Sequence, residues 1–200
     1  MRLLGIIVRG LLAVLLAVFA VPAAWDLLVT VVQARRFVPP VPWAIGGGAV
    51  LGILISCWRK PDWLLHTMLH ESCHALACLV LRVPIRSFAA TDGKGGAVEH
   101  DACDPLRGTL IAIAPYTLPL LLVPALIARA FVVPGPAQAL LSVVVGFLFI
   151  THLVSLVRNI RTNFWGADGD LAKAGRPLSL VLIVLALLAT LAGTVIALWR

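Results

Sequence analysis

The chain has 200 residues, of which 61% are hydrophobic and 12% are charged, and its mean hydropathy is +1.03. Ordinary soluble domains are about 45–50% apolar and about 25% charged, and a domain of this size still exposes much of its surface to water. The composition therefore excludes a soluble enzyme, a disordered chain and a disulfide-stapled secreted module. It indicates an integral membrane protein.

The net charge of +7 does not predict a nucleic-acid-binding protein. The lysines and arginines lie mostly between and beside apolar runs, and they form no basic face with interleaved aromatic residues. This placement fits contact with anionic lipid headgroups, so we expect the lipid bilayer as a partner and no nucleic acid. The four cysteines form no C-x-x-C pair.

Six apolar stretches are each long enough to cross a hydrocarbon core about 30 Å thick. They cover approximately residues 10–32, 41–58, 63–82, 106–132, 137–157 and 178–199. We therefore predict an all-α polytopic membrane protein with about six transmembrane helices, forming a single domain over residues 1–200. No A-x-A cleavage site follows the first stretch, so we expect an uncleaved helix there rather than a signal peptide.

Glycines and prolines predict local features of these stretches. Gly48 and Gly52 in the second stretch are spaced for close helix packing. Pro115, Pro119 and Pro124 remove three backbone donors from the fourth stretch, so we expect that helix to be kinked or broken.

Two polar loops interrupt the apolar pattern. In residues 83–105, strand-like runs at Ile85–Thr91 and at 96–103 flank Asp92-Gly93-Lys94-Gly95, which predicts a small β-hairpin after the third stretch. The other loop covers residues 158–177 and contains Asp168-Gly169-Asp170.

The third stretch contains His70-Glu71-Ser72-Cys73-His74, an H-E-x-x-H sequence. On a helix, positions i and i+4 face nearly the same way, so two imidazoles can bind one Zn²⁺ while the glutamate reaches a nearby water. The composition gives this motif by chance on the order of once in a thousand such chains. Ionisable residues inside an apolar helix are costly, which also favours a functional role. His66 continues this face, where a supporting role is favoured over ligation.

A zinc site needs a third protein ligand. Glu99 in the predicted hairpin is the only later glutamate, and the better candidates are Asp168 and Asp170 before the last helix. Either carboxylate could supply the ligand, although Asp-Gly-Asp is also typical of an ordinary turn.

The H-E-x-x-H motif, followed by an Asp-Gly pair about a hundred residues later, resembles the site-2 protease (M50) family of intramembrane zinc metalloproteases. His74-Ala75-Leu76-Ala77, the Gly-Gly-Ala-Val of the hairpin and Ala112-Ile113-Ala114-Pro115 are similar to that family's segments. The resemblance implies that His70 and His74 bind zinc, that Glu71 is the catalytic base and that Asp168 is the third ligand.

The chain departs from the family pattern before the aspartates. The family often shows Asn-x-x-Pro eight residues before its Asp-Gly, whereas Asn159 stands nine residues before Asp168 and the proline is missing. Asp170 therefore stays as the alternate ligand. Asn159 or Asn163 could donate a hydrogen bond to substrate. We expect His152 in the protein interior and His100 in a loop.

These observations predict a zinc-dependent intramembrane endopeptidase in a bacterial cell membrane, with a transmembrane protein as its substrate. The hairpin would offer an edge strand that pairs with the unwound substrate. The alternative is a transition-metal (zinc) membrane transporter, since some zinc transporters place similar sequences on membrane helices; a third reading is a catalytically idle scaffold. The pattern does not predict an oligomeric state.

Overall fold

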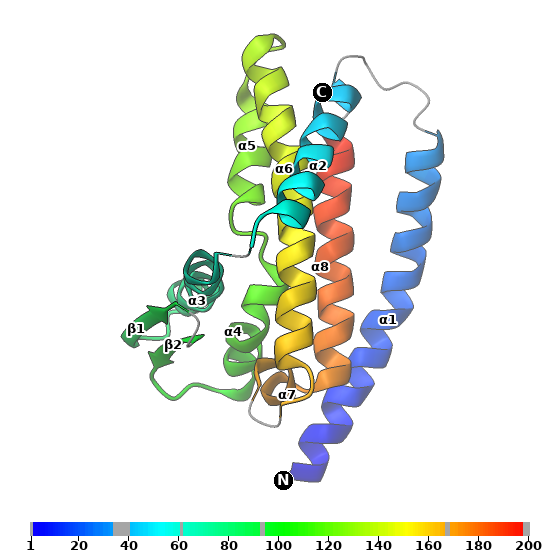
Figure 1. Cartoon of the computed structure of the whole chain (residues 1–200). Helices are drawn as coiled ribbons and strands as arrows, with labels where there is room; N and C mark the ends of the chain where they lie inside the picture. Colours follow the sequence, from blue (N-terminus) through cyan, green and yellow to red (C-terminus); the bar gives the residue numbers. More distant parts are fainter. Residues whose placement is uncertain (1, 34–40, 61, 93–94, 167–168, 198–200) are drawn as a thin grey trace. The chain divides into compact units, whose positions relative to one another are not determined.

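The computed structural model describes residues 2–33, 41–60, 62–92, 95–166 and 169–197. Within these ranges the chain is mostly helical, with one small antiparallel sheet (Figure 1). The elements are α1 (Arg2–Gln33), α2 (Val41–Trp58), α3 (Trp63–Val80), β1 (Ile85–Thr91), β2 (Gly95–His100), α4 (Pro105–Thr117), α5 (Leu122–Phe131), α6 (Pro136–Asn163), α7 (Asp170–Ala174) and α8 (Arg176–Ile196).

The elements fall into two compact units. The first unit consists of residues 1–15, 61–118 and 155–183, and the second consists of residues 16–60, 119–154 and 184–200. The first unit contains α3, the two strands, α4 and α7, whereas α2 and α5 belong to the second; α1, α6 and α8 contribute residues to both. Every described residue of the candidate site lies in the first unit.

Four described helices are long and apolar enough to cross a membrane. They are Ile7–Val29, Val41–Trp58, Pro136–Asn163 and Arg176–Ile196. The pair α4 and α5 would make a fifth span, bent by 71° at the break between them. The predicted break in the fourth stretch is therefore confirmed, and the count of six spans is not. The third stretch forms α3 but is not among the candidates, because three histidines and Glu71 lower the hydropathy of its 18 residues.

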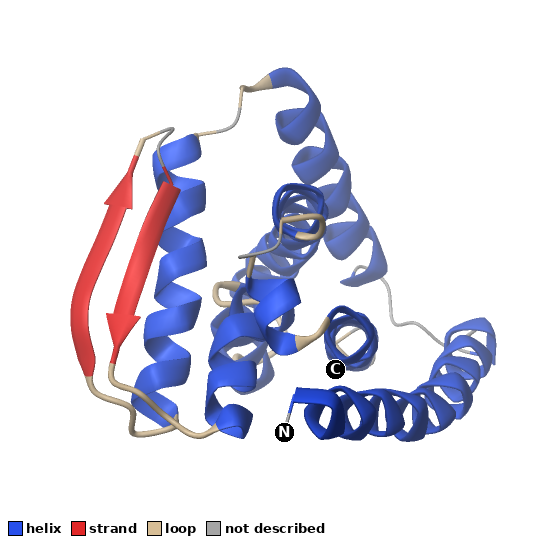
Figure 2. Ribbon diagram, turned by 90° about the horizontal axis from the view of Figure 1, so that it is seen from below, coloured by secondary structure: helices blue, strands red, loops and turns tan. Residues whose placement is uncertain are grey.

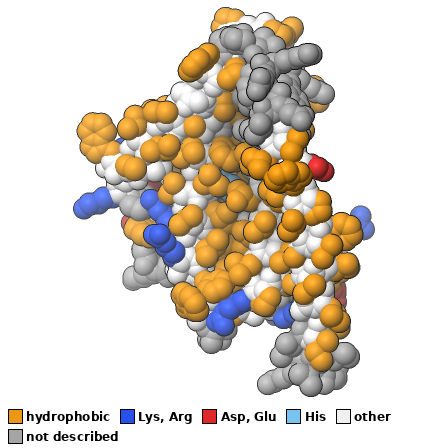
Figure 3. Space-filling model, turned by 90° about the vertical axis from the view of Figure 1, so that its right-hand side faces the viewer, with side chains coloured by type: hydrophobic (Ala, Val, Ile, Leu, Met, Phe, Trp, Pro, Cys, Tyr) orange, Lys and Arg blue, Asp and Glu red, His pale blue; other side chains and the backbone are white. Residues whose placement is uncertain are grey.

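The candidate spans keep most of their apolar surface outside the protein. Only 11 to 28% of each of the four spans is buried, and hydrophobic side chains dominate the face shown in Figure 3. Large side chains such as Leu11, Phe19 and Val184 are exposed. Water would penalise so much exposed apolar area, whereas lipid tails do not.

The β-hairpin of the first unit packs along α3. β1 pairs antiparallel with β2, with Phe88 opposite Val98 and Ala90 opposite Gly96, and Figure 2 shows both strands beside α3. The predicted hairpin is confirmed, and β1 has the predicted bounds. Because β2 runs beside α3, its backbone lies next to the H-E-x-x-H face.

Local capping fixes the ends of the helices that carry the site. The Asp62 side chain accepts a hydrogen bond from the Leu65 amide at 2.9 Å and begins α3. The Asp104 carboxylate accepts from the amides of Leu106 and Arg107, and Pro105 occupies the first turn of α4. Short polar side chains thus define where both helices start.

A small hydrophobic core holds the helices of the first unit together. Tyr116, Leu156, Leu171 and Ile183 form one buried cluster, which joins α4, α6, α7 and α8. Leu171 and Ala174 on the short helix α7 are fully buried. This packing fixes α7, which five residues could not stabilise alone.

In the second unit, glycines let α2 and α6 approach closely. A Cβ atom at Gly48 would lie 1.9 Å from the Val143 carbonyl oxygen, and one at Gly146 would lie 1.9 Å from the Ile45 carbonyl oxygen. A Cβ atom at Gly52 would lie 3.0 to 3.2 Å from atoms of Phe147 and Ile150. The packing role predicted for Gly48 and Gly52 is therefore confirmed.

Candidate metal centre

Two histidines of α3 point into one site. His70 and His74 are four residues apart, which places their rings on one face of the helix, with ring centroids 5.0 Å apart. His74 is buried, and His70 is partly buried. The spacing predicted from H-E-x-x-H is therefore present in three dimensions.

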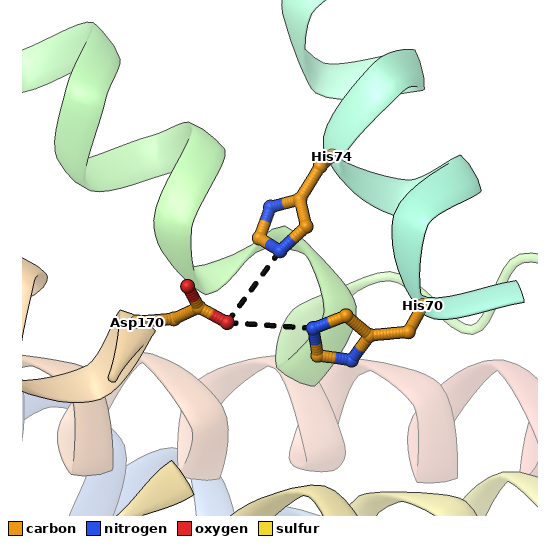
Figure 4. Close-up of side chains that lie close together, drawn as sticks. All are labelled: His70, His74 and Asp170. Atoms are coloured by element: carbon orange, nitrogen blue, oxygen red, sulfur yellow. Dashed lines mark ion pairs between the residues drawn. The ribbon is translucent and has the colours of Figure 1, made fainter. Parts of the chain in front are cut away.

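Asp170 meets both histidines from the start of α7. Its Oδ2 atom lies 3.3 Å from His70 Nε2 and 3.5 Å from His74 Nε2 (Figure 4). One ligand atom from each of the three residues lies within 4.8 Å of the others. A Cβ at Gly169 would lie 2.5 Å from the Asn163 carbonyl oxygen, so glycine allows the tight approach that positions Asp170.

The donor set and its spacing fit a zinc ion. Two atoms bound to one tetrahedral zinc at about 2.0–2.1 Å lie about 3.3 Å apart, which is close to both measured separations. His74 Nδ1 donates a hydrogen bond to the Ile111 carbonyl oxygen at 2.7 Å. In the neutral imidazole this bond places the proton on Nδ1, so Nε2 can present its lone pair to a metal in place of its contact with Asp170.

The charges of the site are set by burial and by the histidines. α3 and α7 lie outside the candidate spans. Burial raises the pKa of the Asp170 carboxyl, but hydrogen bonds from His70 and His74 together act more strongly and hold that pKa below its usual range. Burial also raises the pKa of the Glu71 carboxyl, although the two histidines oppose this. Asp170 is thus held ionised as a ligand must be, whereas Glu71 gains proton affinity.

Glu71 is buried between the two histidines and the hairpin. A Cβ atom at Gly96 would lie 2.6 Å from Glu71 Cγ and 2.8 Å from Thr67 Cγ2. The missing side chain at Gly96 therefore allows β2 to pass directly over the glutamate.

Tyr116 connects the metal-binding residues to the core. Its hydroxyl donates a hydrogen bond to Asp170 Oδ2 at 3.3 Å, and its ring makes an edge contact with His70. The Asn163 side chain hydrogen-bonds the same hydroxyl. Sequence reasoning missed Tyr116, and the only signal for it is its position directly after Pro115, in a segment that resembles the family's.

A cavity of about 870 Å³ opens beside these residues. Its walls come from α3, β2, the start of α4, the end of α6 and α7, all within the first unit. His70, Glu71, His74 and Asp170 line it, as do the backbone and small side chains of β2. The volume is large enough for a short peptide segment to lie against the candidate metal site.

Comparison with known proteins assigns the family. A family model described as Peptidase M50B-like matches residues 47–166, which is more than half of the chain. The chain belongs to the Peptidase M50B-like family. The predicted resemblance to the M50 family is therefore confirmed, and at family level the protein is a membrane metallopeptidase. Neither the curated proteins nor the solved structures contain a match.

The M50B-like match covers α3 and the hairpin but ends before the aspartates. His70, Glu71 and His74 lie within residues 47–166, whereas Asp170 follows that range by four residues. The identity of the third ligand therefore depends on the geometry of the site.

The remaining predicted site residues lie as follows. Asp168, the first choice for third ligand, lies outside the described residues, and Asp170, the alternate, lies beside both histidines. Asn159 and Asn163 line the cavity, and their side chains hydrogen-bond His66 and Tyr116 respectively. Glu99 is exposed and outside the group of metal-ligating side chains.

His66 lies one turn before His70 on the same face of α3. Its Nδ1 atom lies 3.2 Å from Ser155 Oγ on α6, and it lines the cavity. These contacts link α3 to α6 beside the site, which agrees with the supporting role predicted for this histidine.

Proposed function

We propose that the protein is a zinc-dependent intramembrane endopeptidase that hydrolyses peptide bonds of membrane-spanning substrates. His70, His74 and Asp170 would hold the zinc ion, and Glu71 would act as the general base. The proposal is carried by one observation: two Nε2 atoms and a carboxylate oxygen converge beside a buried glutamate in an open cavity. The M50B-like family supports the same chemistry.

The metal ion, Glu71 and Tyr116 would each have a different role in hydrolysis. A bound zinc ion supplies Lewis acidity, which acidifies water and polarises a peptide carbonyl. Glu71 follows His70 directly, precedes His74 by three residues and lines the cavity, so its carboxylate can take a proton from the attacking water and deliver it to the leaving amine. Tyr116 holds Asp170 and contacts His70, which keeps the ligand set in place while the substrate binds.

The hairpin would present the substrate to this site. Gly95, Gly96, Ala97 and Val98 of β2 line the cavity, so an extended peptide could pair with the strand while its scissile bond reaches Glu71. A transmembrane helix hides its carbonyl groups in backbone hydrogen bonds, so the substrate must unwind locally before it pairs. We therefore expect the cleaved segment to contain residues that weaken helices, such as glycine or proline.

The direct test compares Glu71→Gln with Glu99→Gln in proteoliposomes that also contain a panel of single-pass membrane proteins. Both changes remove one carboxylate, but Glu99 is exposed on the hairpin outside the group of metal-ligating residues. Mass spectrometry of the products should show cleavage by the wild type and by Glu99→Gln, and a loss of at least about 1,000-fold in Glu71→Gln with zinc still bound.

Two outcomes would contradict this proposal. Cleavage that survives in Glu71→Gln would remove the assigned base. Zinc flux into the vesicles that depends on His70 and His74, without any cleavage, would instead favour the transporter.

A further inference from the structure

Two cations in the cavity have no role in the proposed metal chemistry. The lysine, arginine and carboxylate side chains among the described lining residues are those of Arg9, Glu71, Asp104, Asp170 and Lys173. Glu71 and Asp170 belong to the metal centre. Asp104 caps α4 and pairs with Arg107 at 3.2 Å. Among the described lining residues, Arg9 and Lys173 are therefore the charged side chains without a carboxylate partner.

The Arg9 side chain lies against the backbone of Lys173 in the cavity wall. Arg9 Nη1 donates a hydrogen bond to the Lys173 backbone oxygen at 3.0 Å, which ties the start of α1 to α7 within the first unit. Lys173 is exposed, and among the described residues neither cation forms an ion pair with a carboxylate. Two cations that line one cavity without a carboxylate partner favour an anionic ligand.

The pair lies within reach of the bond to be cleaved. Lys173 follows Asp170 by three residues on α7, which is about 4.5 Å along a helix axis. An extended peptide advances about 3.3 Å per residue. A substrate carboxylate a few residues from the scissile bond could therefore contact Arg9 and Lys173 while that bond lies at the metal centre.

We propose that Arg9 and Lys173 bind a carboxylate side chain of the substrate and so select proteins with an aspartate or glutamate close to the cleaved bond. This inference rests on the proposed endopeptidase function. A carboxylate is costly in the hydrocarbon core, so the preferred bonds lie near the membrane surface rather than at its centre.

The test uses a model transmembrane peptide whose cleaved bond has been mapped, with the zinc-loaded full chain in phosphatidylcholine vesicles. Aspartate, asparagine or lysine is placed at successive positions on both sides of that bond. At positions on one side of the cleaved bond, aspartate should raise kcat/KM about fivefold over asparagine, as expected for a partly exposed ion pair. Lys173→Glu should reverse the preference in favour of lysine, and Arg9→Gln should reduce it.

Arg161→Glu is the matched control for Lys173→Glu. Arg161 is also an exposed cation of the first unit, but it does not line the cavity. This variant should keep the wild-type preference for aspartate. Equal kcat/KM for aspartate and asparagine at every position would overturn the inference and leave the protease assignment intact.

A binding measurement separates failure of this inference from failure of the proposed function. Fluorescence anisotropy of labelled peptides on zinc-loaded Glu71→Gln should give about fivefold tighter binding of the aspartate peptide, with reversal in the Glu71→Gln, Lys173→Glu double variant. If this preference holds while the wild type cleaves no peptide, the endopeptidase assignment fails and carboxylate binding stands. If Lys173→Glu only weakens activity in phosphatidylglycerol vesicles and leaves peptide preference unchanged, the cations contact lipid headgroups and the inference is wrong.

Discussion

Tyr116 links two of the three candidate metal ligands, His70 and Asp170, to the hydrophobic core of the first unit. The side chain is 1% exposed, and it contacts both Asp170 and His70 while packing against Leu156 and Leu171. A hydrogen bond to a ligating carboxylate orients it and limits its other rotamers. Under the proposed function, Tyr116 would therefore be a positioning residue rather than a catalytic one.

Replacing Tyr116 by phenylalanine should weaken zinc binding without unfolding the site. The change removes the hydroxyl that donates to Asp170 and keeps the ring that packs in the core. We expect about a tenfold loss of zinc affinity, measured by competition with a chromogenic chelator. Thr117→Val is a control, because the Thr117 hydroxyl bonds only backbone carbonyl groups of its own helix. A zinc affinity of Tyr116→Phe equal to that of the wild type would contradict the positioning role.

The two histidines and the glutamate could be predicted from the sequence because their relation is local. A helix fixes the directions of residues four apart, so H-E-x-x-H already defines half of the site. The choice between Asp168 and Asp170 could not be made in this way. Residues two apart in a loop point in directions set by tertiary contacts, here the tight passage of Gly169 past Asn163 and the burial of Leu171.

The hairpin and α3 pack against each other and together line the cavity. Gly96 lies against Glu71 and Thr67, so the distance between strand and helix depends on the absence of a side chain at that position. The strand in turn supplies the cavity wall on which a substrate would pair. The spacing between β2 and α3 therefore controls access to the base.

Gly96→Val should displace β2 from α3 and impair catalysis more than metal binding. The added side chain would overlap Glu71 and Thr67, so either the strand or the glutamate must shift. A shift of about 1 Å is enough to cost on the order of 100-fold in kcat/KM. Peptide cleavage and zinc content measured on one preparation should show the first reduced and the second retained. Ala89→Val adds similar bulk at an exposed position of β1 and should keep near-wild-type activity.

The glycines of the second unit predict a stability difference within one helix. Gly48→Ala would place a Cβ against the Val143 carbonyl, whereas nothing lies within 4 Å of a Cβ at Gly47. We expect Gly48→Ala to destabilise the protein by about 1–3 kcal/mol, and Gly47→Ala to be neutral or slightly stabilising because alanine favours helix. Thermal unfolding in detergent, followed by circular dichroism, measures both. Equal melting temperatures for the two variants would contradict the close packing of α2 and α6.

Helices and strands could be predicted from the sequence where turn residues or prolines marked their ends. Turn residues flanked by strand-like runs predicted the hairpin, and Pro115, Pro119 and Pro124 predicted the break that separates α4 from α5. The prediction was weakest for α3. Its apolar residues, many of them exposed like Leu64 and Leu79, suggested a membrane span, but three histidines and Glu71 make the helix too polar to count among the candidate spans.

The protein combines apolar candidate membrane spans with a polar cavity. The apolar surface of the candidate spans suits lipid. The cavity of the first unit is lined by a small group of charged side chains, which includes Glu71 and Asp170. The candidate metal ligands come from α3 and α7, which are far apart in the chain, so they come together only in the folded protein. The endopeptidase proposal depends on this centre.

Zinc affinity of Asp170→Asn, measured beside Asp168→Asn, tests that centre most directly. The full chain, purified in detergent, would be titrated with zinc against a competing chelator. Asp170→Asn should bind zinc at least about 100-fold more weakly than the wild type, because a neutral amide replaces the ligating carboxylate. Asp168→Asn should keep the wild-type affinity. Tight zinc binding in Asp170→Asn, with loss of binding in Asp168→Asn, would contradict the assignment of His70, His74 and Asp170 as the metal ligands.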